Sequence, residues 1–159
     1  MLGVFDLRKS KLYAMSDSME VDLNAVCLMK SSKKVVTAQA DGVMSIFSWD
    51  WFGDCNDQII GHPSSIDCMT KYDESTVITG GEDGLLRAVS ILPNKIVAIL
   101  GDPLEVEDDI FTGEVSVSHC RNFLASCAHD DMVKIYDVSH LAIRPKDEEF
   151  DLEAYERSV

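Results

Sequence analysis

Three polar residues close together in the chain, His62, Ser64 and Asp67, are of the types that form a hydrolase triad. In such a triad the histidine takes the proton of the serine hydroxyl, and the acid orients the histidine. Ser64 lacks the Gly-x-Ser-x-Gly turn that presents the nucleophile in one large class of hydrolases. These residues therefore do not predict catalysis, and we expect that the chain is not an enzyme.

Sequence patterns that bind cofactors or metals are incomplete in the same way. Gly80-Gly81 is not followed by the Lys-Ser/Thr of a phosphate-binding loop. The acidic stretch from Asp102 to Asp109 lacks the glycine and the spaced oxygen ligands of an EF-hand. No two cysteines have the C-x-x-C spacing of a zinc site. We therefore expect no cofactor and no bound metal.

Composition favours an intracellular protein that binds other proteins. The chain has 159 residues, of which 46% are hydrophobic, and a formal net charge of −14. A basic face for DNA or RNA is therefore not expected, whereas basic protein partners are. Asp6, Arg8 and Lys9 stand where a signal peptide needs apolar residues, and no apolar run is long enough to span a membrane.

The cysteines also favour an intracellular location. They are odd in number, and four of the five lie within apolar, strand-like patterns. Such a distribution predicts buried, reduced thiols rather than a disulfide framework. The five are Cys27, Cys55, Cys68, Cys120 and Cys127.

A pattern of two strands joined by a tight turn recurs along the chain. Its first copy, Thr37–Ser48, contains the Asp41-Gly42 pair, which predicts a hairpin with a type I′ turn. The pattern returns at Thr79–Ser90 and at Ser126–Asp137, and Leu2–Asp6 matches only its last strand.

The spacing of the copies predicts a β-propeller. The last aromatic or apolar positions, Phe5, Phe47, Val89 and Tyr136, are separated by 42, 42 and 47 residues. A period near 40–45 residues with four strands per unit is typical of WD-repeat blades. We therefore predict an all-β, partial WD40-type propeller of about three and a half four-stranded blades out of seven. The expected blades or blade remnants are 1–19, 20–61, 62–101 and 102–138.

The expected strands follow from the same alignment, with the innermost strand of each blade first. In the first unit only the last strand of the pattern is expected, at 2–6. The other units have 25–29, 34–38, 44–49 and 58–60 in the second; 66–69, 76–79, 85–91 and 95–100 in the third; and 115–118, 123–127 and 132–138 in the fourth, which has no outer strand.

Two acidic segments fall outside this pattern. Residues 102–113 form an expected loop between two blades, which is either a solvated connection or a contact for a basic partner. Residues 139–159 are expected to form a flexible acidic tail, with a docking segment as the alternative.

The copies of this strand-turn-strand pattern, which we call cassettes, resemble WD repeats. In WD repeats a histidine, a serine or threonine, the turn aspartate and a tryptophan share a hydrogen-bond chain. The resemblance carries this chain onto His62, Thr79 and Asp83, with Val89 in place of the tryptophan. The neighbouring blades keep two positions each and lack the histidine. These are Thr37 with Asp41, and Ser126 with Asp130. We therefore expect apolar packing to contribute more to the stability of these blades than the incomplete hydrogen-bond chain does.

Longer segments resemble the C-terminal half of the WD repeat-containing protein 55 family. They include Phe47–Cys55, Ile91–Ile96 and Ala128–Asp137. The resemblance implies a non-catalytic scaffold of the nucleus and nucleolus that takes part in ribosome biogenesis and ribosomal RNA processing, with ribosome-assembly factors as partners. As the alternative, it implies a substrate receptor of a cullin-4 ubiquitin ligase.

Two groups of residues are candidate contacts for such partners. The ligase adaptor reads a box that ends in Trp/Tyr/Phe-Asp-x-Arg, which Phe5, Asp6 and Arg8 match, although an ordinary strand end is the alternative. Trp49, Trp51 and Phe52 form either a recognition patch or part of the packing between blades.

A ring of seven blades needs about 300 residues. We therefore expect these 159 residues to be one part of a larger propeller, whose remaining blades are its partners. Left alone, the arc is expected to expose strand edges and an apolar blade face. Two copies that close into one ring are a further alternative.

Overall fold

The computed structural model describes residues 1–100, 112–128 and 132–142. Within these ranges the chain forms strands and one 3-10 helix, η2 (Ser139–Ala142). The strands are β1 (Gly3–Asp6), β2 (Lys11–Met15), β3 (Leu23–Met29), β4 (Lys34–Gln39), β5 (Met44–Ser48), β6 (Asp57–Ile59), β7 (Ile66–Lys71), β8 (Thr76–Gly81), β9 (Leu86–Ser90), β10 (Lys95–Leu100), β11 (Thr112–Val117), β12 (Phe123–Ala128) and β13 (Val133–Asp137).

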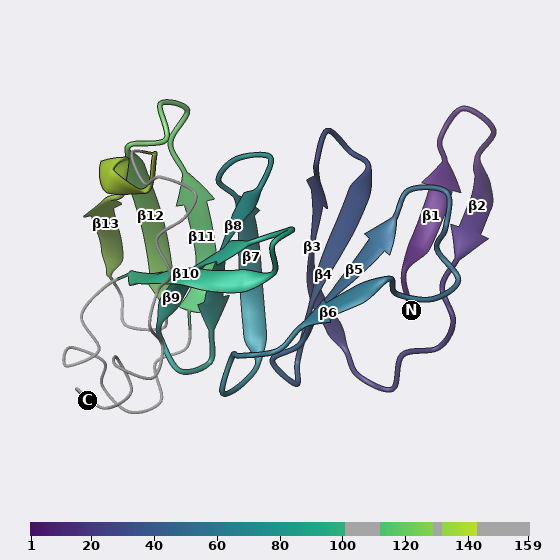
Figure 1. Cartoon of the computed structure of the whole chain (residues 1–159), viewed down its shortest axis with the longest axis horizontal. Helices are drawn as coiled ribbons and strands as arrows, with labels where there is room; N and C mark the ends of the chain where they lie inside the picture. Colours follow the sequence, from purple (N-terminus) through teal and green to yellow (C-terminus); the bar gives the residue numbers. More distant parts are fainter. Residues whose placement is uncertain (101–111, 129–131, 143–159) are drawn as a thin grey trace.

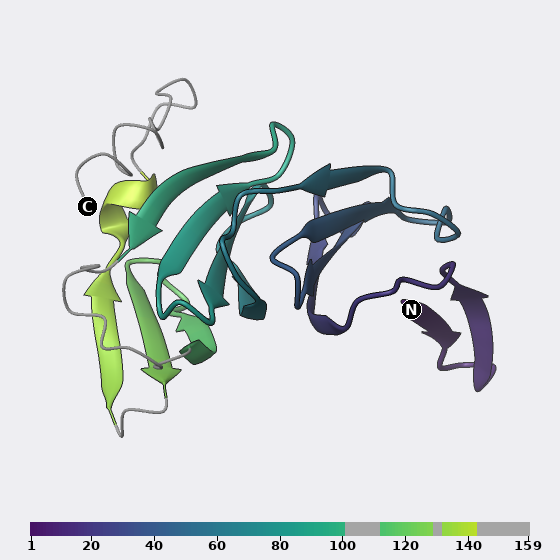
Figure 2. The same cartoon turned by 90° about the horizontal axis from the view of Figure 1, so that it is seen from below.

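The strands form four antiparallel sheets that follow one another along the chain. β1 pairs with β2, β3–β6 and β7–β10 form four-stranded sheets, and β11–β13 form a three-stranded one. The first strands of the larger sheets, β3, β7 and β11, lie next to one another. The sheets therefore fan out from a common inner side (Figures 1 and 2). The predicted all-β fold with four-stranded antiparallel sheets is confirmed, and it is consistent with a partial WD40-type propeller.

One strand was absent from the prediction. In the first unit only the strand at 2–6 was expected, but Lys11–Met15 forms β2 and pairs with β1. Tyr13 favours strands, but Lys11 and Ala14 are residue types depleted in strands, so this short run has no clear strand pattern. The remaining strands lie where the repeat alignment placed them, with ends that differ by a few residues.

The predicted type I′ turn is wrong. The amide of Gly42 donates to the carbonyl of Gln39 at 3.2 Å, and the amide of Gln39 donates to the carbonyl of Val43 at 3.1 Å. Gly42 has a φ of 80°, but Asp41 does not have the positive φ that a type I′ turn needs. The loop is therefore a three-residue hairpin with a glycine bulge. Asp41 instead accepts a hydrogen bond from the amide of Val43 at 3.1 Å.

The same turn recurs in the next sheet. The amide of Gly84 donates to the carbonyl of Gly81 at 3.1 Å, and Gly84 has a φ of 73°. Asp83 accepts from the amide of Leu85 at 3.2 Å, as Asp41 does from Val43. The aspartate of each of these two turns thus stabilises the turn itself. The turn of the third cassette contains residues 129–131, which lie outside the described residues.

Apolar clusters fill the spaces between neighbouring sheets, so both faces of the four-stranded sheets are buried. On β4, Val35 packs toward β1–β2 while the next residue, Val36, packs toward β7–β10. On β8, Val77 and Ile78 divide in the same way. The cluster between the two four-stranded sheets contains Met29, Val36, Ala38, Met44, Ile46, Ile59, Ile66, Val77, Val89 and Ile91.

Polar contacts also join the two four-stranded sheets. The side-chain amide of Asn24 donates to the carbonyl of Ile66 at 3.1 Å. The ammonium of Lys30 donates to Ser75 Oγ at 2.9 Å, on the loop between β7 and β8. These bonds connect the inner strand of one blade to the next blade, and they fix the relative position of the two sheets.

All five cysteines are free, but they are not all buried. Cys68 is buried and two others are half-buried, whereas Cys120 and Cys127 are exposed. The expectation of buried thiols is therefore wrong for these two. Cys120 lies in the turn between β11 and β12, and Cys127 lies on a side of β12 that none of the described sheets covers.

The two acidic segments lie mostly outside the described residues. Of the predicted loop 102–113, residues 112–113 begin β11, and 102–111 are not described. Of the predicted tail 139–159, residues 139–142 form η2, and 143–159 are not described. Their predicted roles stay predictions. In the described part of the chain, no helix has the length and apolar character of a membrane span.

We predict that Gly42→Ala destabilises the chain by more than about 1–2 kcal/mol, the cost of a left-handed conformation for a residue with a Cβ. An added Cβ would also lie 2.6 Å from the carbonyl oxygen of Ser64 and 2.8 Å from that of His62, and backbone atoms cannot move aside easily. Urea unfolding measures the change.

Gly53→Ala is the matched control. Its added Cβ meets no atom within 4 Å, and Gly53 does not have a positive φ. Its free energy of unfolding should change by no more than about 0.5–1 kcal/mol. Equal losses in the two variants would contradict the role given to Gly42.

Candidate interaction surface

A hydrogen-bond chain runs through the β7–β10 sheet. His62 Nε2 lies 2.9 Å from Thr79 Oγ1, and Thr79 Oγ1 donates to the carbonyl of Arg87 at 3.3 Å. A hydroxyl has only one proton, so Nε2 of His62 must be the donor to Thr79. The other ring nitrogen, Nδ1, then carries a lone pair, and it is buried without a partner among the described residues.

This environment keeps His62 neutral. The pKa of His62 is lowered to about 4, mainly by burial and also by the positive charge of Arg87, while Asp83 partly opposes both. A buried imidazole whose acceptor nitrogen faces no donor is a poor general base in solution near pH 7, because proton uptake is disfavoured. The role of His62 is therefore structural: it ties the segment before β7 to β8.

The WD-repeat resemblance implies that Asp83 is part of this hydrogen-bond chain, but the structure places Asp83 elsewhere. Its two carboxylate oxygens accept from Arg87, with Nη1–Oδ1 at 3.0 Å and Nη2–Oδ2 at 2.6 Å. The Arg87 side chain is almost fully buried, so this bidentate pair is shielded from solvent. Thus His62 and Thr79 are brought together as predicted, and Asp83 is directed to Arg87 instead.

Two equivalent positions that hold different residues in the two four-stranded sheets explain this difference. In the first four-stranded sheet, Gln39 donates to Ser45 Oγ at 2.5 Å. Forty-two residues later the same positions hold Gly81 and Arg87. Because Gly81 has no side chain, Arg87 can reach the turn aspartate; an added Cβ there would lie 2.9 Å from Asp83 Oδ1. The sequence signal for the ion pair is this exchange, which lies outside the WD-repeat pattern.

The other predicted network residues have local roles. Thr37 Oγ1 donates to the carbonyl of Ser45 at 3.4 Å, and Asp41 holds its own turn. Ser126 is buried on β12. Its predicted partner Asp130 lies outside the described residues.

An aromatic surface lies beyond the end of β5. Trp51 is 69% exposed and Trp49 is nearly half exposed, whereas Phe52 is buried. Phe52 packs with Val35 and Phe47 in the cluster between β1–β2 and β3–β6, and its ring meets that of Trp49 edge to face at 5.4 Å. The three predicted residues therefore divide: Phe52 belongs to the packing between blades, and the two tryptophans remain available to a partner.

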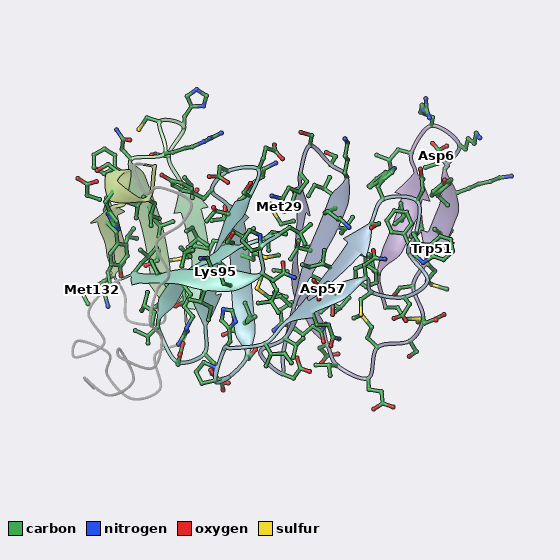
Figure 3. The ribbon with its side chains drawn as sticks, viewed as in Figure 1. Asp6, Met29, Trp51, Asp57, Lys95 and Met132 are labelled. Atoms are coloured by element: carbon green, nitrogen blue, oxygen red, sulfur yellow. The ribbon has the colours of Figure 1, made fainter. Side chains whose placement is uncertain are left out.

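The candidate adaptor box lies at the same end of the molecule, as the labels of Asp6 and Trp51 in Figure 3 show. Phe5 is 64% exposed, and the Arg8 side chain is 93% exposed. Asp6 Oδ1 accepts from the amides of Arg8 and Lys9 at 2.9 and 3.3 Å. Asp6 therefore stabilises the turn that presents Arg8 to solvent.

The residues considered for catalysis do not form a triad. His62 is bonded to Thr79, Asp67 accepts from Ser65 Oγ at 2.7 Å, and Ser64 Oγ is buried. Among the described residues, no three His, Cys, Asp or Glu side chains are grouped so that they could hold a metal.

We predict that Asp83→Asn destabilises the chain by about 3 kcal/mol or more, because the buried Arg87 charge loses its partner. Asp41→Asn is the matched control at the equivalent turn, where the aspartate is exposed and has no arginine partner among the described residues. We expect a loss of at most about 0.5 kcal/mol there. Urea unfolding of both variants checks this, and similar losses would contradict it.

We also predict that stability falls as pH decreases from about 6.5 toward 4 because of His62. In this window the unfolded chain binds a proton that the folded chain refuses, so the free energy of unfolding rises with pH and levels off above about 6.5. The full effect is on the order of 3 kcal/mol.

His62→Gln should remove this part of the pH dependence, because glutamine can still donate to Thr79 and does not titrate. The measurement is urea unfolding at several pH values between 5 and 8, where the carboxylates contribute least. The same slope in both proteins would show that His62 does not titrate as inferred.

Comparison with known proteins agrees with this geometry. The family model for the WD domain, G-beta repeat, matches residues 110–137. WD repeat-containing protein 55 of Pongo abelii is 39% identical over 140 residues, which cover 88% of this chain and 36% of that protein. The human protein of the same name is 38% identical over 144 residues, with 88% and 36% covered.

A plant relative shows the same match. WD repeat-containing protein 55 of Arabidopsis thaliana is 35% identical over 144 residues, which cover 88% of this chain and 38% of that protein. The chain thus spans little more than a third of the length of these relatives. It belongs to the WD-repeat family of β-propeller proteins, and the relatives named here are WD repeat-containing protein 55.

Proposed function

We propose that the chain is a non-catalytic scaffold that binds other proteins in the nucleolus, during ribosome biogenesis and ribosomal RNA processing. Its similarity to WD repeat-containing protein 55, a family with the implied nucleolar role described above, supports the process. WD repeats support the scaffold role, because the stacked sheets form a rigid frame on which loops can present contacts. The observation that carries the proposal is the exposed Trp49–Trp51 surface on such a frame.

The net charge of the chain favours basic proteins over RNA as partners. A net charge of −14 opposes direct binding to RNA, because a nucleic-acid-binding face needs clustered lysine and arginine. Proteins that bind RNA carry such basic faces themselves. An acidic scaffold with exposed aromatic anchors therefore suits basic, RNA-binding assembly factors, with charge steering the encounter and the tryptophans contributing most of the contact energy.

A second candidate function is that of a substrate receptor of a cullin-4 ubiquitin ligase. It is favoured by one feature, the exposed Phe5 and Arg8 beside a turn that Asp6 stabilises. A box that an adaptor reads must present its arginine to solvent, and Arg8 meets this requirement.

We predict that a tagged chain expressed in cells locates to the nucleolus and recovers pre-ribosomal assembly factors. Trp51→Ala should reduce this recovery at least tenfold, because an aromatic side chain that becomes buried in an interface contributes about 2 kcal/mol or more to binding. Ile60→Ala, at another exposed apolar position, is the control that should leave it unchanged. Recovery that is equal in both variants would contradict the role of the aromatic surface.

The same experiment tests the alternative. Recovery of the adaptor and cullin-4, lost in Arg8→Ala and kept in Lys9→Ala, would favour the ligase receptor. Lys9 is an exposed neighbour of the same charge. Comparison of the two variants therefore distinguishes the loss of the specific arginine contact from the loss of one positive charge. Assembly factors without adaptor would favour the scaffold.

A further inference from the structure

Basic side chains gather at one end of the strands. The turns that join β1 to β2, β3 to β4, β7 to β8 and β11 to β12 all lie along one edge of the molecule, the upper edge in Figure 1. We call this the basic edge, formed by residues 6–11, 30–34, 71–76 and 118–122. Its basic residues are Arg8, Lys9, Lys11, Lys30, Lys33, Lys34, Lys71 and Arg121, and its acidic residues are Asp6, Asp73 and Glu74.

The opposite ends of the strands have the reverse charge. The described connections there are residues 16–22, 40–43, 60–65 and 82–85, and they contain six acids and no lysine or arginine. A strand of six residues, such as β4 or β8, is about 20 Å long. This length exceeds the Debye length of about 8 Å at physiological ionic strength, so distant acids only weakly offset the positive charge of the basic edge. The net charge of the chain therefore does not describe this edge.

The central turns of the basic edge contact one another. The amide of Lys30 donates to the carbonyl of Glu74 at 3.2 Å, which joins the β3–β4 turn to the β7–β8 turn. Arg121, in the β11–β12 turn, is close enough to Glu74 to help lower the pKa of its carboxyl. Sheets lie on both sides of the β3–β4 turn, yet residues 31–33 are exposed. The turns lie beyond the ends of the strands, so the stacking of sheets leaves them open to solvent.

One carboxylate is already bound at this edge. Glu74 Oε2 accepts from the amide of Ser31 at 2.5 Å, and Glu74 Oε1 accepts from Lys71 Nζ at 2.6 Å. The hydrogen bond from Lys71, followed by that from the Ser31 amide, lowers the pKa of Glu74. Ser31 lies between two other residues of positive φ, and backbone amides in turns of this kind are suited to bind anions. The edge thus stabilises a charged carboxylate with one backbone donor and one lysine.

Other basic groups on the edge remain available for further carboxylates. Lys33 and Arg121 are exposed and have no acidic partner among the described residues, and the same holds for Lys9 and Lys11 on the β1–β2 hairpin. Asp73 does not compete for them, because it accepts from two backbone amides of its own turn. The basic edge therefore has more cationic groups than it has carboxylates to pair with them.

We propose that the basic edge binds an acidic segment of a partner protein, whose aspartate and glutamate side chains pair with Lys33, Arg121 and the lysines beside them. RNA suits this edge less well. The four turns expose no phenylalanine, tyrosine or tryptophan on which a base could stack, since Tyr72 is buried. The group that the edge already holds is a carboxylate. This surface is separate from the Trp49–Trp51 surface and does not depend on the nucleolar role proposed above.

The test is fluorescence anisotropy of a labelled oligoglutamate peptide titrated with the full chain. The wild type should bind, and less tightly as salt increases, because exposed charges are screened. Lys33→Gln combined with Arg121→Asn should lower the affinity about fivefold, since two exposed ion pairs are lost. Asparagine is used because Arg121 has a φ of 60°, which asparagine tolerates.

A matched control separates the edge from the charge of the whole chain. Gln58→Glu combined with Ile60→Glu changes the net charge by the same amount at exposed positions outside the basic edge, and it should leave the affinity unchanged. Equal losses in the two double variants would overturn the proposal. Urea unfolding identifies any variant that has lost its fold. Lys9→Gln with Lys11→Gln, on a separate hairpin, then replaces the first double variant.

Two further measurements test the identity of the ligand. Glu74→Gln should raise the affinity for the peptide about twofold or more, because it makes Lys71 and the Ser31 amide available. Asp41→Asn, which removes the same charge from the opposite end of the strands, should not change it. Tighter binding of an oligouridine of equal charge, with the same dependence on Lys33 and Arg121, would assign the edge to RNA and overturn the proposal. So would the absence of peptide binding by the wild type.

Discussion

The burial of both faces of each four-stranded sheet is the constraint on which the rest of this structure depends. A fully buried valine, leucine or phenylalanine side chain contributes about 1.5–3 kcal/mol, and each sheet carries several on either face. Neither face can meet water without losing that contribution. The strands therefore have consecutive apolar residues, such as Val35-Val36 and Val77-Ile78, instead of the alternation of a sheet with one wet face.

Close packing of the sheets also determines where polar groups can lie. The turn at Gly42 touches the backbone of His62 and Ser64, so the connection to the next blade leaves no room for a side chain. Next to it, His62 is buried with Thr79, and Arg87 is buried with Asp83. Both pairs lie within one sheet, where each buried polar group finds a partner that offsets the loss of its contact with water. Among the described residues, His62 Nδ1, Ser64 Oγ and Tyr72 Oη are buried without a partner, and burial of His62 lowers its pKa and makes stability depend on pH.

The fold was predictable because the repeat supplies several independent copies of one signal. The Asp-Gly pair, the strand pattern and the spacing all agree, and strand positions follow from alignment of the copies. The turn type was not predictable from Asp41-Gly42 alone, since the same pair fits both a two-residue and a three-residue loop. The Asp83–Arg87 pair was missed because it depends on Gly81 and Arg87 together, and each differs from its counterpart in the preceding blade.

Surface exposure could not be inferred from residue type in the aromatic segment. Phe52 and Trp51 are adjacent and similar in hydrophobicity, yet one packs under β1–β2 and the other faces solvent. The difference arises from the route of the loop after β5, which no periodic pattern constrains. The same holds for β2, whose only partner among the described strands is β1.

The arrangement assigns structural and binding roles to different parts of each repeat. The faces of the two four-stranded sheets are covered by neighbouring sheets, and the described polar networks hold turns and connections in place. What remains for a partner is the set of loops and the ends of the arc, where Trp49, Trp51 and the turn after Phe5 are exposed. Loops can change without loss of the junctions, so two chains with the same sheets can bind different proteins. The repeated strand pattern thus determines the fold, and the loop residues that connect the strands determine which protein is bound.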